Sequence, residues 1–442
     1  MTGKLIRHWA PVAAGTVALG IALTGCTGFG GSSSGGSGSG GATISFLVNN
    51  SDTSVAAAKE LAKEFTAANP DIKVDVQTRP QGSDGDNTIK TKLATGDMAD
   101  VFEYNSGSLF QQINPGQNLV AVTGQSYMSD VSDSFKPVVT AGKDVYGVPF
   151  GSGVAGAVLY NKKVYSKLGL SVPKTWADFV SNSQKIKASG TVPIIQSYKD
   201  TWTSQLFVLG DFANVAKAEP NFAADYTANK AKYATDPAAI KGFEHQEEAA
   251  KDALFNKDFA STTYNQALDM LANGDGAQYP ILTSAIAGIQ ANDPDQINDI
   301  GMFPLPGDDA SKNALTIWFP SGVYIPKSSK HVAEAEKFQA FLASKAGCDA
   351  QTKGSAPSGP YLVKDCTLPS NTPPAVQDML PYFNDTAKNS PALEFLSPVK
   401  GPNLEQITVE VGTQQVSAQK GASLYDEDVK KQAQQLNLPG WS

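Results

Sequence analysis

Residues 44–76 read ISFLVNNSDTSVAAAKELAKEFTAANPDIKVDV, and their pattern changes period twice. Apolar residues alternate over Ile44–Val48, which predicts a strand, and then recur at helical spacing over Val55–Phe65. The pair Asn69-Pro70 ends this helix, because the residue before a proline disfavours helical backbone. Alternation resumes over Ile72–Val76 as a second strand. Strand, helix and strand in close succession form a βαβ unit, so we predict an α/β fold with a parallel sheet.

The loops after the predicted strands are candidate ligand loops. A further helix is expected over Thr88–Thr95 and a further strand over Asp100–Tyr104. Ligands of open α/β sheets bind beyond the carboxyl ends of the strands, which points to loops at 49–52, 81–84 and 104–108. The candidate ligand-binding residues there are Asn50, Asp52, Gln81, Tyr104 and Asn105. Asn50 and Asp52 are equally consistent with capping the first helix.

A crossing point is expected at Gly151-Ser152-Gly153, between extended segments at Val145–Phe150 and Val154–Tyr160. Glycine tolerates backbone conformations that other residues avoid, so the chain can bend here. Ser152 joins the candidate ligand residues. Farther along, one strand-like stretch carries Trp318 and Phe319, and a helix over Val332–Ser344 precedes three more helical segments.

The beginning of the chain is organised like an export signal. Met1–His8 holds two basic residues, Trp9–Leu23 is uncharged and apolar, and small residues lead to Cys26. Leu23-Thr24-Gly25-Cys26 resembles the lipobox of bacterial lipoproteins, whose cysteine receives a diacylglyceryl group and becomes the new N-terminus. The resemblance implies a signal peptide over 1–25 and two acyl chains on Cys26, enough for durable anchoring. A plain secretory signal with an incidental cysteine is the alternative.

The rest of the composition is consistent with a folded body tethered outside a membrane. Glycine and serine dominate 26–41, which predicts a flexible linker with a reach on the order of 20 Å. The formal net charge of −8 argues against nucleic acid and anionic lipid surfaces as partners, so membrane contact is expected only through the lipid. In an oxidising compartment, Cys348 and Cys366 most simply form a disulfide.

The sequence gives little support for catalysis. The two histidines after the signal, His245 and His331, are far apart and lack metal-ligand spacing. The Gly151-Ser152-Gly153 segment is too short for a nucleophile elbow, and no Gly-x-x-x-x-Gly-Lys-Ser phosphate loop occurs. We therefore expect no enzymatic activity, no metal and no cofactor.

Five segments match the pattern of a known family in its order. They are Leu93–Val101, Val145–Pro149, Leu159–Lys163, Leu168–Phe179 and Ile325–Leu342. The most specific is Leu168–Phe179, which reads LGLSVPKTWADF. Together they resemble the carbohydrate-binding lipoproteins of ABC importers, the maltose-binding-protein-like family 1 of bacterial solute-binding proteins.

This resemblance implies a two-lobed, periplasmic-binding-protein-like fold with discontinuous lobes joined by crossing hinge strands. One lobe would hold 42–150 and about 320–365, and the other 151–319 and about 366–442. The lobes of such receptors close over a ligand, and the closed form docks on permease subunits. We expect a monomer that captures a carbohydrate, most simply an oligosaccharide, on the outer face of a Gram-positive cell membrane.

Sugars present hydroxyl groups and flat C–H faces, so their sites combine polar side chains with aromatic planes. Trp202 and Trp318 are candidate platforms because each lies where a strand meets a loop, although core packing is the alternative for both. The neighbouring candidates are Phe319, Glu394 and Phe395. We expect Trp176 to pack in the core and Trp441 to lie at the surface.

The chain departs from the family pattern in one segment. Gln278 replaces a usual methionine, and Ser284 stands near the place of a usual tryptophan. Tyr279 is the candidate substitute for that missing aromatic platform. Two other functions stay open: the same scaffold binding a peptide or polyol, and a surface glycosidase or adhesin.

Overall fold

The predicted strand–helix–strand unit is present in the computed structural model, which describes residues 41–383 and 385–441. Strand β1 (Ala42–Asn49) leads into α1 (Asp52–Ala68), and β2 (Ile72–Arg79) pairs in parallel with β1 over its whole length. The Ser51 hydroxyl caps α1 by accepting from the Ser54 amide at 3.3 Å. The signal peptide, Cys26 and the linker up to residue 40 lie outside the described residues.

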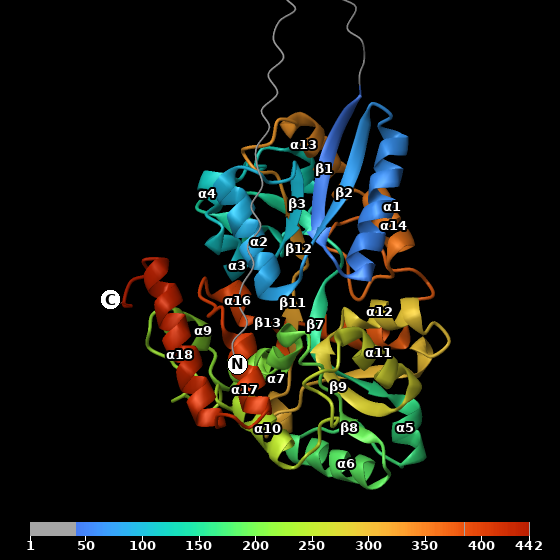
Figure 1. Cartoon of the computed structure of the whole chain (residues 1–442), viewed down its shortest axis with the longest axis vertical. Coiled ribbons are helices and arrows are strands. Elements are labelled where there is room, and N and C mark those ends of the chain that lie inside the picture. Colours follow the sequence, from blue (N-terminus) through green and yellow to red (C-terminus); the bar gives the residue numbers. More distant parts are fainter. Residues whose placement is uncertain (1–40, 384, 442) are drawn as a thin grey trace, which may run out of the picture. The chain divides into compact units, whose positions relative to one another are not determined.

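A five-stranded sheet contains this unit. Its strands, in spatial order, are β2, β1, β3 (Val101–Tyr104), β12 (Ser321–Tyr324) and β6 (Gly147–Phe150). Strands β1, β2 and β3 are parallel, whereas β12 runs antiparallel to both of its neighbours. Helices α1 and α14 (Lys345–Gly354) lie side by side next to this sheet (Figure 1).

A second sheet has six strands. In spatial order they are β13 (Asn389–Pro391), β11 (Leu315–Trp318), β7 (Val154–Asn161), β9 (Gly276–Leu282) and β8 (Val192–Ile194), with β10 (Ile300–Pro304) also paired to β7. A short hairpin of β4 (Thr140–Ala141) and β5 (Asp144–Val145) stands apart from both sheets.

The chain passes three times between the two sheets, and the first two passages are short segments between consecutive strands. It leaves the first sheet after β6 and enters the second at β7, with Gly151-Ser152-Gly153 between them. It returns from β11 to β12 through Phe319-Pro320. The predicted crossing at Gly151 is confirmed, and Gly151 has a φ of 88°, which favours glycine.

Helices surround both sheets. Before the second crossing they are α2 (Gly82–Thr95), α3 (Ser108–Gln112), α4 (Pro115–Asn118), α5 (Lys162–Lys167), α6 (Trp176–Ala188), α7 (Leu206–Gly210), α8 (Phe212–Ala218), α9 (Phe222–Thr227), α10 (Lys241–Lys251), α11 (Tyr264–Asn273) and α12 (Ala285–Asn292). After it they are α13 (Val332–Leu342), α14, α15 (Pro374–Phe383), α16 (Leu393–Leu396), α17 (Leu404–Gly412) and α18 (Ala418–Gln435).

The two sheets have separate hydrophobic cores. Phe338 of α13 contacts Phe46 of β1 and Phe65 of α1 edge to face in the first core, with ring centroids 5.1 Å apart in each pair. Around the second sheet, Trp176 stacks on His245 at 4.1 Å between ring centroids and donates its indole N–H to Glu248 at 2.7 Å. The core role predicted for Trp176 is confirmed.

Four sequence-based expectations were wrong. Helix α2 begins at Gly82 rather than Thr88, so most of the predicted loop at 81–84 is its first turn. The single stretch predicted around Trp318 is two strands in different sheets. Among the described residues, five helices rather than three follow α13. Trp441 is 1% exposed, because it packs in the core beside α18 and donates its indole N–H to the Thr227 carbonyl.

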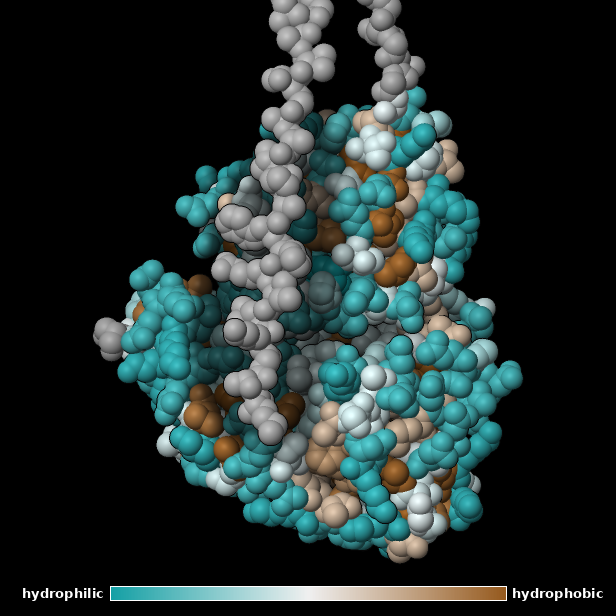
Figure 2. Space-filling model, viewed as in Figure 1, coloured by the Kyte–Doolittle hydropathy of each residue, from teal (hydrophilic) through white to brown (hydrophobic). Residues whose placement is uncertain are grey.

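The predicted disulfide between Cys348 and Cys366 is present. It joins α14 to the segment that follows it. On the face shown in Figure 2, hydrophilic residues predominate and hydrophobic ones form small separate patches. Within the described residues, no helix has the length and apolar character needed to cross a membrane.

Candidate binding cleft

A cavity of about 520 Å³ is lined by residues that follow strands of both sheets. From the first sheet come the ends of β1, β2 and β3 with the first turns of α1 and α2. From the second come the end of β9, the end of β11 and parts of α7, α11 and α12. The loop before α17 completes the wall. The cavity therefore lies where the topology of an open α/β sheet places ligands.

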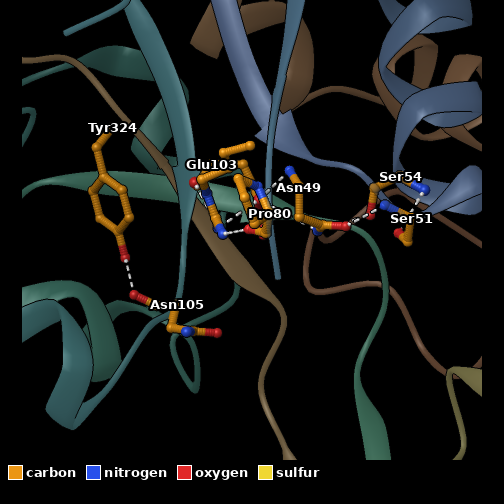
Figure 3. Close-up of polar contacts among 8 residues, drawn as sticks. Asn49, Ser51, Ser54, Pro80, Glu103, Asn105 and Tyr324 are labelled. Atoms are coloured by element: carbon orange, nitrogen blue, oxygen red, sulfur yellow. Dashed lines mark hydrogen bonds and ion pairs between the residues drawn. The ribbon is translucent and has the colours of Figure 1, made fainter. Parts of the chain in front are cut away.

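A buried ion pair forms one side of this cavity. The Arg79 guanidinium lies 3.1 Å from the Glu103 carboxylate, and the same carboxylate accepts the Asn49 backbone N–H at 3.1 Å (Figure 3). Arg79 also donates to the Pro80 carbonyl at 3.0 Å. These contacts hold three neighbouring strand ends in one arrangement, so their side chains present a fixed polar surface to the cavity.

The start of α1 adds amide and hydroxyl groups to this surface. The Asn49 side chain donates to the Ser54 hydroxyl at 3.0 Å and accepts the Ser51 backbone N–H at 3.0 Å (Figure 3). Because Ser51 supplies the cap, the side chains of Asn50 and Asp52 are not needed for that role, and both line the cavity.

An aromatic pair lies on the opposite side. Trp202, in the short 3₁₀ helix Thr201–Gln205, is half-buried and lies 5.3 Å from Tyr264 between ring centroids. The Asp200 carboxylate accepts the Tyr264 backbone N–H at 2.7 Å and so ties the two segments together. Both aromatic side chains line the cavity, and such faces suit the C–H surface of a sugar ring.

Trp318, at the end of β11, belongs to a chain of polar contacts. Its indole N–H donates to the Glu394 carboxylate, whose other oxygen lies 3.0 Å from the Lys400 ammonium. Burial acts to lower the pKa of Lys400, but Glu394 with nearby Asp86 and Glu405 outweighs it and raises that pKa. Trp318, Glu394 and Lys400 all line the cavity.

A second cavity of about 250 Å³ shares part of this wall and extends to the crossing strands. Ser152, Phe319 and Phe395 line it, and the Ser152 hydroxyl accepts the Ser358 backbone N–H at 3.0 Å. Phe319 and Phe395 meet edge to face, with ring centroids 5.0 Å apart. These three residues therefore lie beside the first cavity and the crossing.

The structure brings most of the residues proposed from the sequence together. Those that line the larger cavity are Asn50, Asp52, Gln81, Asn105, Trp202, Trp318 and Glu394. Tyr104 and Tyr279 line neither cavity, because both are fully buried. The Tyr104 ring lies under the Arg79 guanidinium, 5.7 Å from its centroid, and the Tyr279 hydroxyl contacts that of Ser197. Tyr279 thus does not replace the missing family tryptophan as an exposed platform.

Several lining residues were not anticipated from the sequence. They are Arg79, Asp86, Glu103, Tyr264, Lys400 and Glu405. Two signals could have found some of them: Arg79 is a charged residue at the end of a strand, and Tyr264 follows Thr263, whose capping box with Gln266 marks a helix start. The contributions of Lys400 and Glu405 depend on where a proline-rich loop folds back, which has no local signal.

The cavity can accept and donate many hydrogen bonds. Burial raises the pKa of the Asp86 carboxyl above its usual range, although the cations Lys400, Lys90 and Arg79 act in the opposite direction. No group of three or more histidine, cysteine, aspartate or glutamate side chains in the part of the chain described here could hold a metal ion. The arrangement suits a ligand that offers many hydroxyl groups and an apolar face.

Comparison with known proteins identifies the family. The model of the bacterial extracellular solute-binding proteins matches residues 49–347. The chain belongs to this family. As a solute-binding protein of this kind, it works outside the cytoplasm, and the predicted kinship with receptors of ABC importers is confirmed.

Individual relatives are more distant. A multiple sugar-binding protein of Streptococcus mutans is 27% identical over 72% of this chain and 74% of its own. A melibiose/raffinose/stachyose-binding protein of Bacillus subtilis, MelE, is 23% identical over 76% of this chain and 78% of its own. The solved structure of the solute-binding protein RafE with raffinose superposes with a TM-score of 0.73, at 21% identity, over 88% of this chain and 99% of RafE. This superposition confirms the predicted two-lobed solute-binding fold.

Proposed function

We propose that this solute-binding protein is a lipid-anchored, non-enzymatic receptor that captures a carbohydrate, most simply an oligosaccharide, and delivers it to the permease of an ABC importer. Its relatives from Streptococcus mutans and Bacillus subtilis carry sugar-binding names. The ligand-binding residues would be those that line the larger cavity, with the residues of the smaller cavity beside them.

The observation that carries this proposal is the composition of the cavity wall. Trp202 with Tyr264 offers an aromatic surface on one side, and Trp318 lies beside Glu394. Asn50 and Asn105 supply amide groups from the first sheet. Aromatic planes bind sugar C–H faces with little loss of conformational entropy, and the polar groups fix the positions of the hydroxyls.

Ligand binding would favour closure of the two lobes. We place one lobe at 42–150 with about 320–365 and the other at 151–319 with about 366–442, so that the crossing segments form the hinge. A ligand that contacts both walls binds the closed form more tightly, and the population shifts by that difference in affinity. The closed surface, carried by a monomer, would then dock on the permease.

The anchor completes the proposal. Two acyl chains on Cys26 would hold the receptor at the outer face of a Gram-positive membrane, and the Gly/Ser linker would let it reach the permease. A Cys26→Ser variant is expected to move from the membrane fraction to the culture medium, as measured by immunoblotting of both fractions.

The test of the ligand class is a fluorescence titration of the chain from Thr27 onward, which retains every described residue. The panel contains raffinose, stachyose and xylo-, galacto-, malto-, gluco- and fructo-oligosaccharides. Amino acids, glycerol and other polyols, and a peptide mixture are included for comparison. We expect saturable binding of one glycan class without release of reducing sugar. Binding of a peptide or polyol alone would show that the scaffold binds a solute other than a carbohydrate. Release of reducing sugar would show that the protein is a glycosidase.

A further inference from the structure

Acidic side chains outnumber basic ones in the wall of the larger cavity. What we infer from this difference rests on the proposed carbohydrate function. Among the described residues that line it, five are acidic and two are basic. The acidic residues are Asp52, Asp86, Glu103, Glu394 and Glu405, and the basic ones are Arg79 and Lys400. A carboxylate or phosphate on a ligand would need a cation that is not already neutralised.

Both cations are already paired with a carboxylate of the chain itself. Arg79 lies 3.1 Å from Glu103, and Lys400 lies 3.0 Å from Glu394. Side chains of both pairs are largely buried, with exposed fractions of 6% and 4% for the first pair and 17% and 14% for the second. Displacing Glu394 from Lys400 would leave a carboxylate with little water and no counter-ion, which is unfavourable.

The two helix N-termini in the cavity wall also lie beside acidic groups of the chain itself. A helix N-terminus attracts anions through its free amide groups and its dipole. Helix α1 carries Asp52 in its first turn and is capped by Ser51. Helix α2 carries Asp84 in its first turn, and its Ser83 hydroxyl donates to the Glu405 carboxylate. Each anion-attracting feature of the wall therefore already faces an acidic group of the chain.

We propose that the cavity selects uncharged carbohydrates and rejects those that carry a carboxylate or phosphate group, and that Glu394 enforces this selection by pairing with Lys400. Asp52, Asp86 and Glu405 have no ion-pair partner within 4.0 Å among the described residues. They can accept hydrogen bonds from sugar hydroxyls but repel an anionic ligand. Specificity here comes from a repulsive element as well as from attractive contacts.

The first experiment compares neutral sugars with their carboxylate derivatives. Raffinose, stachyose and maltotriose are titrated beside the same sugars after oxidation of their primary hydroxyl groups to carboxylates. We expect each oxidised sugar to bind at least about tenfold more weakly than its parent in low salt. The difference should narrow as salt is raised, because the Debye length falls from about 30 Å at 0.01 M to about 3 Å at 1 M.

The second experiment tests the role of Glu394. A Glu394→Gln variant frees Lys400, so the affinity ratio of oxidised to parent sugar should rise by at least about threefold. Replacing both residues, as Glu394→Gln with Lys400→Met, should abolish that rise. The matched control is Glu427→Gln, the same change on the exposed face of α18, which should leave the ratio unchanged.

The outcomes separate the two proposals. Equal or tighter binding of the oxidised sugars by the unmodified protein overturns the charge selection and leaves the carbohydrate receptor intact. A wild-type preference that persists undiminished in Glu394→Gln overturns the assignment to Glu394. Absence of binding to every sugar, charged or not, overturns the carbohydrate function itself and the charge selection with it.

Discussion

Arg79 reaches Glu103 across the end of a strand that separates them. Arg79 ends β2 and Glu103 lies on β3, while β1 runs between these two strands. The two side chains meet at 3.1 Å, and the Asn49 amide of β1 donates to the same carboxylate. One buried ion pair therefore connects three parallel strands at the edge where the cavity lies.

Breaking this pair should destabilise the protein strongly. Either Arg79→Met or Glu103→Leu leaves the partner charge buried and uncompensated, which typically costs about 3–5 kcal/mol. The double variant should cost less than the sum of the two single changes. Urea unfolding measures all three, and Asp349→Asn, which breaks an exposed pair with Lys345, should cost under about 1 kcal/mol. If the double variant loses as much unfolding free energy as the two single variants together, Arg79 and Glu103 are not directly coupled.

Loss of either tryptophan should weaken sugar binding. For the sugar identified by titration, Trp202→Ala and Trp318→Ala should each raise Kd by about tenfold or more, because a tenfold change corresponds to about 1.4 kcal/mol. Trp202→Phe keeps an aromatic plane beside Tyr264 and should retain more affinity. Isothermal titration calorimetry checks this, and an unchanged Kd in Trp202→Ala would remove Trp202 from the ligand-binding surface.

Reduction of the Cys348–Cys366 disulfide should lower stability without unfolding the chain. The two cysteines are 18 residues apart, and a closed loop of about 15 residues contributes about 3 kcal/mol by limiting the unfolded chain. Urea unfolding with and without a thiol reductant measures the loss. A variant with both cysteines changed to serine should reproduce it and no longer respond to the reductant.

Asp211 should make stability fall as pH rises through the acidic range. Burial raises the pKa of this carboxyl to about 6, while nearby His245 acts in the opposite direction. The folded protein therefore keeps a proton that the unfolded chain releases near pH 4, so this contribution is present below about pH 4 and lost as pH rises through about 6. A shift of about two units corresponds to about 3 kcal/mol.

The measurement is urea unfolding at several pH values between 4 and 8. Asp211→Asn should gain stability relative to the wild type as pH rises, because it removes the proton linkage while an amide oxygen can still accept from Asn214. The exposed change Asp97→Asn serves as the control. A constant difference between Asp211→Asn and wild type across this range would contradict the linkage.

The parts of the fold that were predicted correctly depend on local pattern. The unit β1–α1–β2 and the strand β3 have clear alternation or helical spacing, and Gly151 has no side chain to restrict the backbone at the crossing. The start of α2 was missed because glycines and serine at residues 82–85 have low helix propensity, so tertiary contact with Glu405 favours this turn.

The parts that could not be predicted depend on distant segments. Strand β9 is buried over nearly all of its length, so its sequence does not indicate which side chain faces a cavity. For this reason Tyr279 was expected to face the ligand, whereas it is fully buried. Trp441 lies near the end of the sequence, yet Lys232 covers its ring at 4.0 Å. Lys400 reaches the cavity only because its loop folds back beside Glu394.

The position of β12 has a consequence for how this protein is made. Strands β3 and β6 come early in the chain, but β12, which joins them, becomes available only after residue 324 has been synthesised. Until then both strands have an open edge, so the first sheet cannot be completed from the early part of the chain alone. Completion of the first sheet thus requires nearly three quarters of the polypeptide, and a shorter nascent chain exposes unpaired strand edges.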